Sequence, residues 1–108
     1  MSTAASSYLD RLYGELWISL ASLLRSYTAL YGLGGNWQAA VEADEERILA
    51  SHAGRWLKLT RTGAVILWEQ SSGDHGEFEL TEAGRLRGAE TEKEMDMAAE
   101  TWARELMQ

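Results

Sequence analysis

A short turn pattern occurs three times in the middle of the chain and limits the folds that the chain can adopt. Each copy is a Ser or Thr, two further residues, a Gly and a residue that starts a new run: SHAGR at 51–55, TRTGA at 60–64 and TEAGR at 81–85. A type I turn followed by a left-handed residue needs Gly at its last position, because only Gly adopts positive φ without steric cost. Since the chain has no proline, glycine is the clearest marker of its turns. We therefore predict a three-residue hairpin loop at each place.

Loops of this length fix which residues face each other across each hairpin. They place three pairs opposite each other: Leu49 with Leu57, Thr60 with Ala64, and Leu80 with Leu86. Glu79 then opposes Arg87 as a cross-strand ion pair on the reverse face. The face predicted to form the core carries Leu49, Leu57, Leu59, Val65, Leu67, Phe78, Leu80 and Leu86.

The remaining residues predict an α+β protein in one domain, residues 1–108, with an N-terminal helix, an antiparallel β-meander of four to six strands and a C-terminal helix. The strands are expected near 46–51, 55–60, 64–70, 77–81 and 85–88. Residues 37–42 fit either an edge strand or a short helix.

Each predicted helix shows an apolar stripe and end signals. Apolar residues recur at steps of three or four across 8–31, a Ser7–Asp10 capping box precedes them, and Gly32, Gly34 and Gly35 follow. Trp17 and Ile18 fall outside this stripe, so the helix is expected to touch more than one neighbour. A Thr91–Glu94 capping box starts the last helix, whose stripe includes Met95, Ala98, Ala99, Trp102 and Leu106.

The second face of the predicted sheet is more apolar than a solvated face should be. It brings together Ile48, Trp56, Ile66 and Trp68, with Lys58 and Thr60 between them. Aromatic anchors of this kind are enriched at interfaces. We therefore interpret these four residues as an interface or ligand patch; a helix packed over the same face is the alternative.

Charge and cysteine content narrow the classes of function. The net charge of −7, from 17 acidic and 10 basic residues, disfavours broad binding to nucleic acid or to an anionic membrane. The most apolar segment, 16–33, is interrupted by Ser, Thr and Arg and is a poor membrane span. Without cysteine there is no zinc–thiolate site and no thiol chemistry. Because residues 1–17 also lack a signal-peptide pattern, we expect a cytoplasmic protein.

The sequence offers no catalytic constellation, and we expect no catalytic residue, no metal site and no cofactor. Asp74 and His75 are neighbours in a Gly-flanked loop, where solvated side chains are the ordinary outcome. His52 lies in a predicted turn. The acidic run from Glu42 to Glu46 is expected to form a solvated bend rather than a cation site.

LTEAGRL, residues 80–86, resembles the strand-to-helix junction of winged-helix regulators of the MarR and PadR type. That resemblance implies a helix-turn-helix within 37–61, with Arg55, Lys58 and Arg61 on one face of a recognition helix. The alternation of residues 55–60 and the glycines at 84 and 88 favour strands instead.

Taken together, the sequence predicts a small non-catalytic protein that acts as a protein–protein interaction or self-associating module, most simply a homodimer. Its interface is expected at the Trp56/Trp68 face or at spare apolar surface on the first helix. The alternatives are a carrier or sensor of a small apolar ligand and a winged-helix DNA-binding regulator.

Overall fold

The structure is a computed structural model that describes residues 3–32 and 39–108. The fold consists of two helices and a seven-stranded antiparallel sheet whose strands lie side by side in chain order. The elements are α1 (Thr3–Tyr31), β1 (Ala40–Ala43), β2 (Arg47–His52), β3 (Arg55–Thr62), β4 (Val65–Gln70), β5 (His75–Leu80), β6 (Arg85–Arg87), β7 (Glu92–Glu94) and α2 (Met95–Leu106). The predicted α+β class and order are confirmed, and the five expected strands are present, with β1 and β7 in addition.

The first two turns are one residue shorter than predicted. His52 faces Arg55 directly, and the two residues between them both have positive φ, 51° at Ala53 and 83° at Gly54, as in a type I′ turn. At the second turn Thr62 faces Val65, with Gly63 at φ 61°, the arrangement of a type II′ turn. These turns match the twist of the flanking strands better than a type I turn does.

The register predicted for these two hairpins is therefore wrong, and several side chains change face. Because successive side chains alternate, an odd shift in pairing moves a residue to the other side of the sheet. Leu59 lies opposite Trp68, and Ala50 lies opposite Leu57. The core face carries Ile48, Ala50, Leu57, Leu59, Ile66, Leu80 and Leu86. Leu49, Val65 and Leu67, predicted for the core, lie on the other face.

The third turn is as predicted. Leu80 faces Leu86 and Glu79 faces Arg87, whose guanidinium forms an ion pair with the Glu79 carboxylate. Gly84 has a φ of 79°, and the hydroxyl of Thr81 accepts a 3.1 Å hydrogen bond from the backbone N–H of Arg85.

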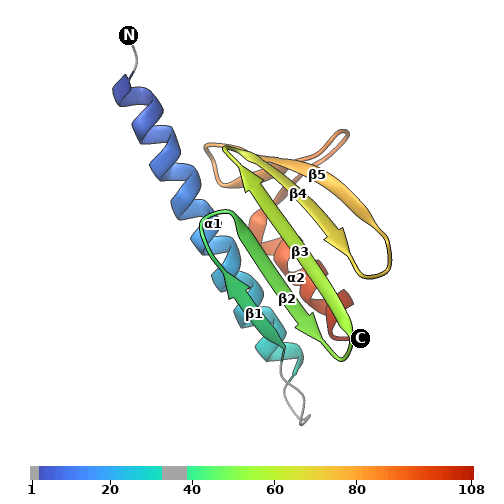
Figure 1. The fold of residues 1–108 in the computed structure, drawn as a ribbon. Coiled ribbons are helices and arrows are strands. Elements are labelled where there is room, and N and C mark those ends of the chain that lie inside the picture. Colours follow the sequence, from blue (N-terminus) through green and yellow to red (C-terminus); the bar gives the residue numbers. More distant parts are fainter. Residues whose placement is uncertain (1–2, 33–38) are drawn as a thin grey trace.

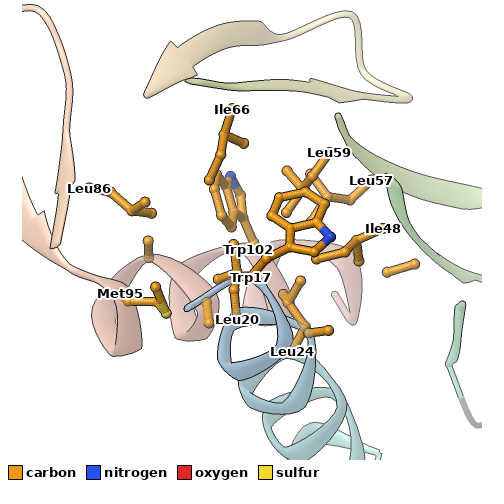
Figure 2. Close-up of a cluster of buried hydrophobic side chains, with 14 of the residues drawn as sticks. Trp17, Leu20, Leu24, Ile48, Leu57, Leu59, Ile66, Leu86, Met95 and Trp102 are labelled. Carbon is orange, nitrogen blue, oxygen red and sulfur yellow. The ribbon is translucent and has the colours of Figure 1, made fainter. Parts of the chain in front are cut away.

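Both helices cover the same face of the sheet (Figure 1). Figure 2 shows Trp17 of α1 and Trp102 of α2 pointing from the helices toward the sheet, where Ile66, Leu57 and Leu59 meet them. Trp102 also contacts two half-buried aromatic rings, at centroid distances of 6.2 Å to Trp68 and 5.9 Å to Phe78. In the described part of the chain, no helix lies over the other face of the sheet.

The predicted starts of both helices are wrong, and the structure shows which of the two alternatives holds for residues 40–42, strand or helix. α1 begins at Thr3, so Ser7 lies inside the helix and is not its cap. α2 begins at Met95; Glu94 is its N-cap residue without a side-chain capping bond. Residues 92–94 instead form β7, which pairs with β6; the carboxylates of Glu92 and Glu94 lie 3.4 and 3.7 Å from the guanidinium of Arg85. Residues 40–43 are a strand; Gly34, Gly35 and residues 37–38 lie outside the described residues.

Candidate interaction groove

The structure does not bring the predicted patch together as one exposed surface. Ile48 and Ile66 are fully buried beneath the helices. Trp68 lies on the same face, half-buried against Trp102. Trp56 lies on the opposite face, where it faces Ser51 in β2 and is half-buried. Three of the four residues therefore belong to the packing between sheet and helices, and Trp56 stands apart from them.

Trp68 has a local structural role that the sequence pattern did not reveal. It lies opposite Gly76 in β5, and a Cβ atom at Gly76 would come within 2.7 Å of the indole Nε1. The indole thus occupies the space that a side chain at position 76 would fill. Gly76 is required here by a close approach and not by a turn.

The face of the sheet away from the helices is mainly polar. Leu67, which is 52% exposed, lies between Thr60 and Glu77 across the neighbouring strands. In the next row Lys58 faces Glu69. An antiparallel sheet with one solvated face shows this composition, so the face does not by itself indicate a binding surface.

A groove of about 650 Å³ runs between α1 and the β1–β2 turn. Its α1 side is formed by residues that repeat at helical spacing. Its other side is formed by the end of β1, the turn that follows and one side chain from β3. The lining residues are Asp10, Arg11, Gly14, Glu15, Trp17, Ile18, Ala21 and Arg25 on α1, and Ala43, Asp44, Glu45 and Arg61 opposite.

The floor of this groove lies beside the core stripe of α1. Trp17 is 2% exposed and Ala21 is 3% exposed, whereas Ile18, the neighbour of Trp17, is 65% exposed. The sequence placed both Trp17 and Ile18 outside the apolar stripe of this helix; that is wrong for Trp17, which belongs to the buried core, and only Ile18 lies outside it. An isoleucine exposed to this degree beside an apolar floor leaves apolar surface in contact with water.

Gly14 is the residue of the groove that sequence reasoning missed. It lies in the interior of α1, where glycine is about 1 kcal/mol less favourable than alanine. A Cβ atom at this position would meet no described atom within 4 Å. Packing among the described residues therefore gives no reason for a glycine at this point of the helix, and its position inside the predicted helix was the signal available in the sequence.

The wall opposite α1 is held in place by several hydrogen bonds. The Asp44 carboxylate accepts bonds of 2.9 and 2.8 Å from the backbone N–H groups of Glu46 and Arg47, and these bonds lower the pKa of Asp44. The guanidinium of Arg61 donates to the main-chain carbonyl of Glu45 and lies 5.8 Å above the ring of Trp17. The turn is thereby anchored both to β3 and to α1.

The groove is nearly balanced in charge, in contrast to the whole chain. Four carboxylates and three guanidinium groups line it, whereas the chain carries a net charge of −7. In the described part of the chain, the side chains of Asp10, Arg11 and Arg25 form no ion pair.

Of the residues considered for chemistry in the sequence, His52, Asp74 and His75 lie apart from this groove, whereas Asp44 and Glu45 of the acidic run line it. Asp74 and His75 are exposed, and the Asp74 carboxylate accepts a 3.2 Å hydrogen bond from Ser72. Across residues 3–32 and 39–108, no three His, Asp or Glu side chains are grouped so that they could hold a metal ion. Within the same ranges, no helix has the length and apolar character needed to cross a bilayer.

Comparisons with protein families, curated proteins and solved structures found no match to this chain. The winged-helix resemblance finds no counterpart in the fold. Residues 55–62, which include the expected recognition helix, form strand β3. Residues 85–87, which follow the LTEAG junction, form strand β6.

Proposed function

We propose that this protein is a non-catalytic interaction module that self-associates as a homodimer through the groove beside α1. The observation that carries the proposal is Ile18, 65% exposed on the rim of an apolar floor that includes Trp17 and Ala21. Burial of one isoleucine side chain contributes about 1.5–3 kcal/mol. In a two-fold dimer the same residue is buried twice.

The length of α1 supports an interface of useful size. The helix has 29 residues and spans about 43 Å, and its N-terminal end projects past the β1–β2 hairpin (Figure 1). A specific dimer buries about 1,200–2,000 Å² in total, an area that a long helix and an adjoining groove can provide.

Sedimentation velocity from low to high micromolar concentration tests this proposal. We expect the sedimentation coefficient to rise with concentration toward that of a species of twice the 12.1 kDa chain mass. A single 12.1 kDa species at every concentration would exclude self-association.

The second candidate function is binding of a small apolar ligand in the same groove. Its volume of about 650 Å³ lies within the range of about 300–1,000 Å³ that is typical of ligand sites. Thermal-shift measurements with a hydrophobic ligand library test this function. Stabilisation that is lost in Ile18→Asp would support it, and no stabilisation by any compound would count against it.

A further inference from the structure

We infer that the groove is filled by α1 of a second copy, which lies antiparallel with the two-fold axis between positions 17 and 18. This inference rests on the proposed function and specifies its geometry. In such a pair, residues at equal distances on either side of the axis face each other. Three pairs of positions then face each other on each side of the axis: 17 and the partner's 18, 14 and the partner's 21, and 10 and the partner's 25.

The α1 residues at the apolar centre of the groove have the spacing of a socket that takes one side chain from a facing helix. Gly14, Trp17, Ile18 and Ala21 are spaced i, i+3, i+4 and i+7 on α1. Four residues with this spacing form the hole that receives a knob from a facing helix. The exposed Ile18 of the partner provides the knob, and symmetry gives each copy one knob and one hole.

The small residues in this hole permit close approach of the two helices. The position of Gly14 is open, since a Cβ atom there would have no described neighbour within 4 Å. In the proposed pair Gly14 faces the partner's Ala21, so two small residues meet on each side of the axis. Packing within one copy gives no reason for a glycine at position 14. The close approach of a second helix backbone at this position would give one, because only glycine has no side chain in the way.

The charges at the two ends of the groove select the antiparallel orientation. Asp10 and Arg25 are both exposed, and neither forms an ion pair within the described part of the chain. The antiparallel pair brings Asp10 to the partner's Arg25 twice. A parallel pair in register would place Asp10 beside the partner's Asp10 and Arg25 beside the partner's Arg25, so like charges would repel.

Charge reversal in single and double variants tests this arrangement by sedimentation equilibrium. We expect Asp10→Arg and Arg25→Asp each to weaken dimerisation by about tenfold, because each creates two like-charge contacts. The double variant Asp10→Arg with Arg25→Asp should restore the wild-type dissociation constant. Both positions are exposed, so circular dichroism should show an unchanged fold.

The outcomes separate this inference from the proposed function. One outcome is that wild type dimerises but the double variant loses as much dimerisation free energy as the two single reversals together. In that case the antiparallel register is wrong while self-association stands. If wild type remains a monomer, the inference fails together with the self-association on which it rests.

Cysteine cross-linking gives a second readout, because the chain has no cysteine of its own. A mixture of Asp10→Cys and Arg25→Cys chains should form a covalent heterodimer with a short bifunctional maleimide. Asp10→Cys alone should not, since the two equivalent positions then lie about 22 Å apart along the helix axis. Rapid cross-linking of Asp10→Cys alone would indicate the parallel pair and overturn the inference. Leu67→Cys, on the outer sheet face, is the matched control and should not cross-link.

Discussion

The indole Nε1–H of Trp17 donates a 2.7 Å hydrogen bond to the main-chain carbonyl of Asp44. The two residues are 27 positions apart in sequence, and their contact ties α1 to the turn between β1 and β2. On the other side of the same turn, the guanidinium of Arg61 holds the carbonyl of Glu45. A single aromatic residue therefore belongs to the core, anchors the edge of the sheet and forms the floor of the groove.

Trp17→Phe should lower the free energy of unfolding by about 1–3 kcal/mol, because the Asp44 carbonyl loses its donor and the core loses volume. Urea unfolding measures this change. Trp56→Phe is the control, since Trp56 is half-buried on the outer sheet face, and it should cost less. Equal losses in the two variants would show that the Trp17–Asp44 contact is not stabilising.

Asp44 should make the stability of the turn dependent on acid pH. Its pKa is lowered in the folded protein by the backbone N–H groups of Glu46 and Arg47. Its contribution is therefore complete above the unfolded value of 3.8 and is lost as the pH falls through the lower folded value. Urea unfolding of wild type and Asp44→Asn over this range should show a stability difference that shrinks with acidification. A difference independent of pH would contradict the assignment.

Two neighbouring residues of β4 test the strand register. Ile66 is fully buried, while Leu67 is 52% exposed. Ile66→Ala should destabilise the protein by about 2–5 kcal/mol, as expected for a truncated core side chain. Leu67→Ala should change stability by only about 0.5 kcal/mol. Chemical denaturation of both variants tests the observed pairing. The register of a three-residue turn would bury Leu67 instead of Ile66, so it predicts that Leu67→Ala is the more destabilising change.

Ala53 offers a stabilising substitution. Its φ of 51° is left-handed, a conformation that costs a residue other than glycine about 1–2 kcal/mol. Asparagine adopts it more readily at this position of a type I′ turn, so Ala53→Asn should stabilise the protein by about 0.5–1 kcal/mol. Ala83→Asn, in the third turn, lacks this conformational reason and should bring no gain. Thermal denaturation compares the two, and equal melting temperatures would contradict the prediction.

Periodicity and turn residues were sufficient to predict the element order. The apolar stripe of α1, the alternation in residues 55–60 and the glycines at 54, 63 and 84 identified a helix and a meander. Register was harder, because Ser-x-x-Gly and Thr-x-x-Gly fit both two-residue and three-residue loops. The choice depends on backbone φ values at Ala53 and Gly63, which the residue types alone do not fix.

The predicted patch depended on that register. A shift by an odd number of residues turned Trp68 toward Leu59 and left Trp56 on the other face. The groove could not be predicted, since Asp44 and Trp17 are distant in sequence and meet only through the tertiary fold. The prediction of spare apolar surface on the first helix depended on local periodicity alone, and Ile18 is indeed exposed.

The groove as the site of self-association is tested most directly by sedimentation equilibrium of Ile18→Asp and Leu67→Asp. Both residues are large, apolar and more than half exposed, but only Ile18 lines the groove. At a concentration where wild type is a dimer, Leu67→Asp should keep twice the 12.1 kDa chain mass and Ile18→Asp should fall to 12.1 kDa. A dimeric Ile18→Asp, or a monomeric wild type at high micromolar concentration, would contradict the account.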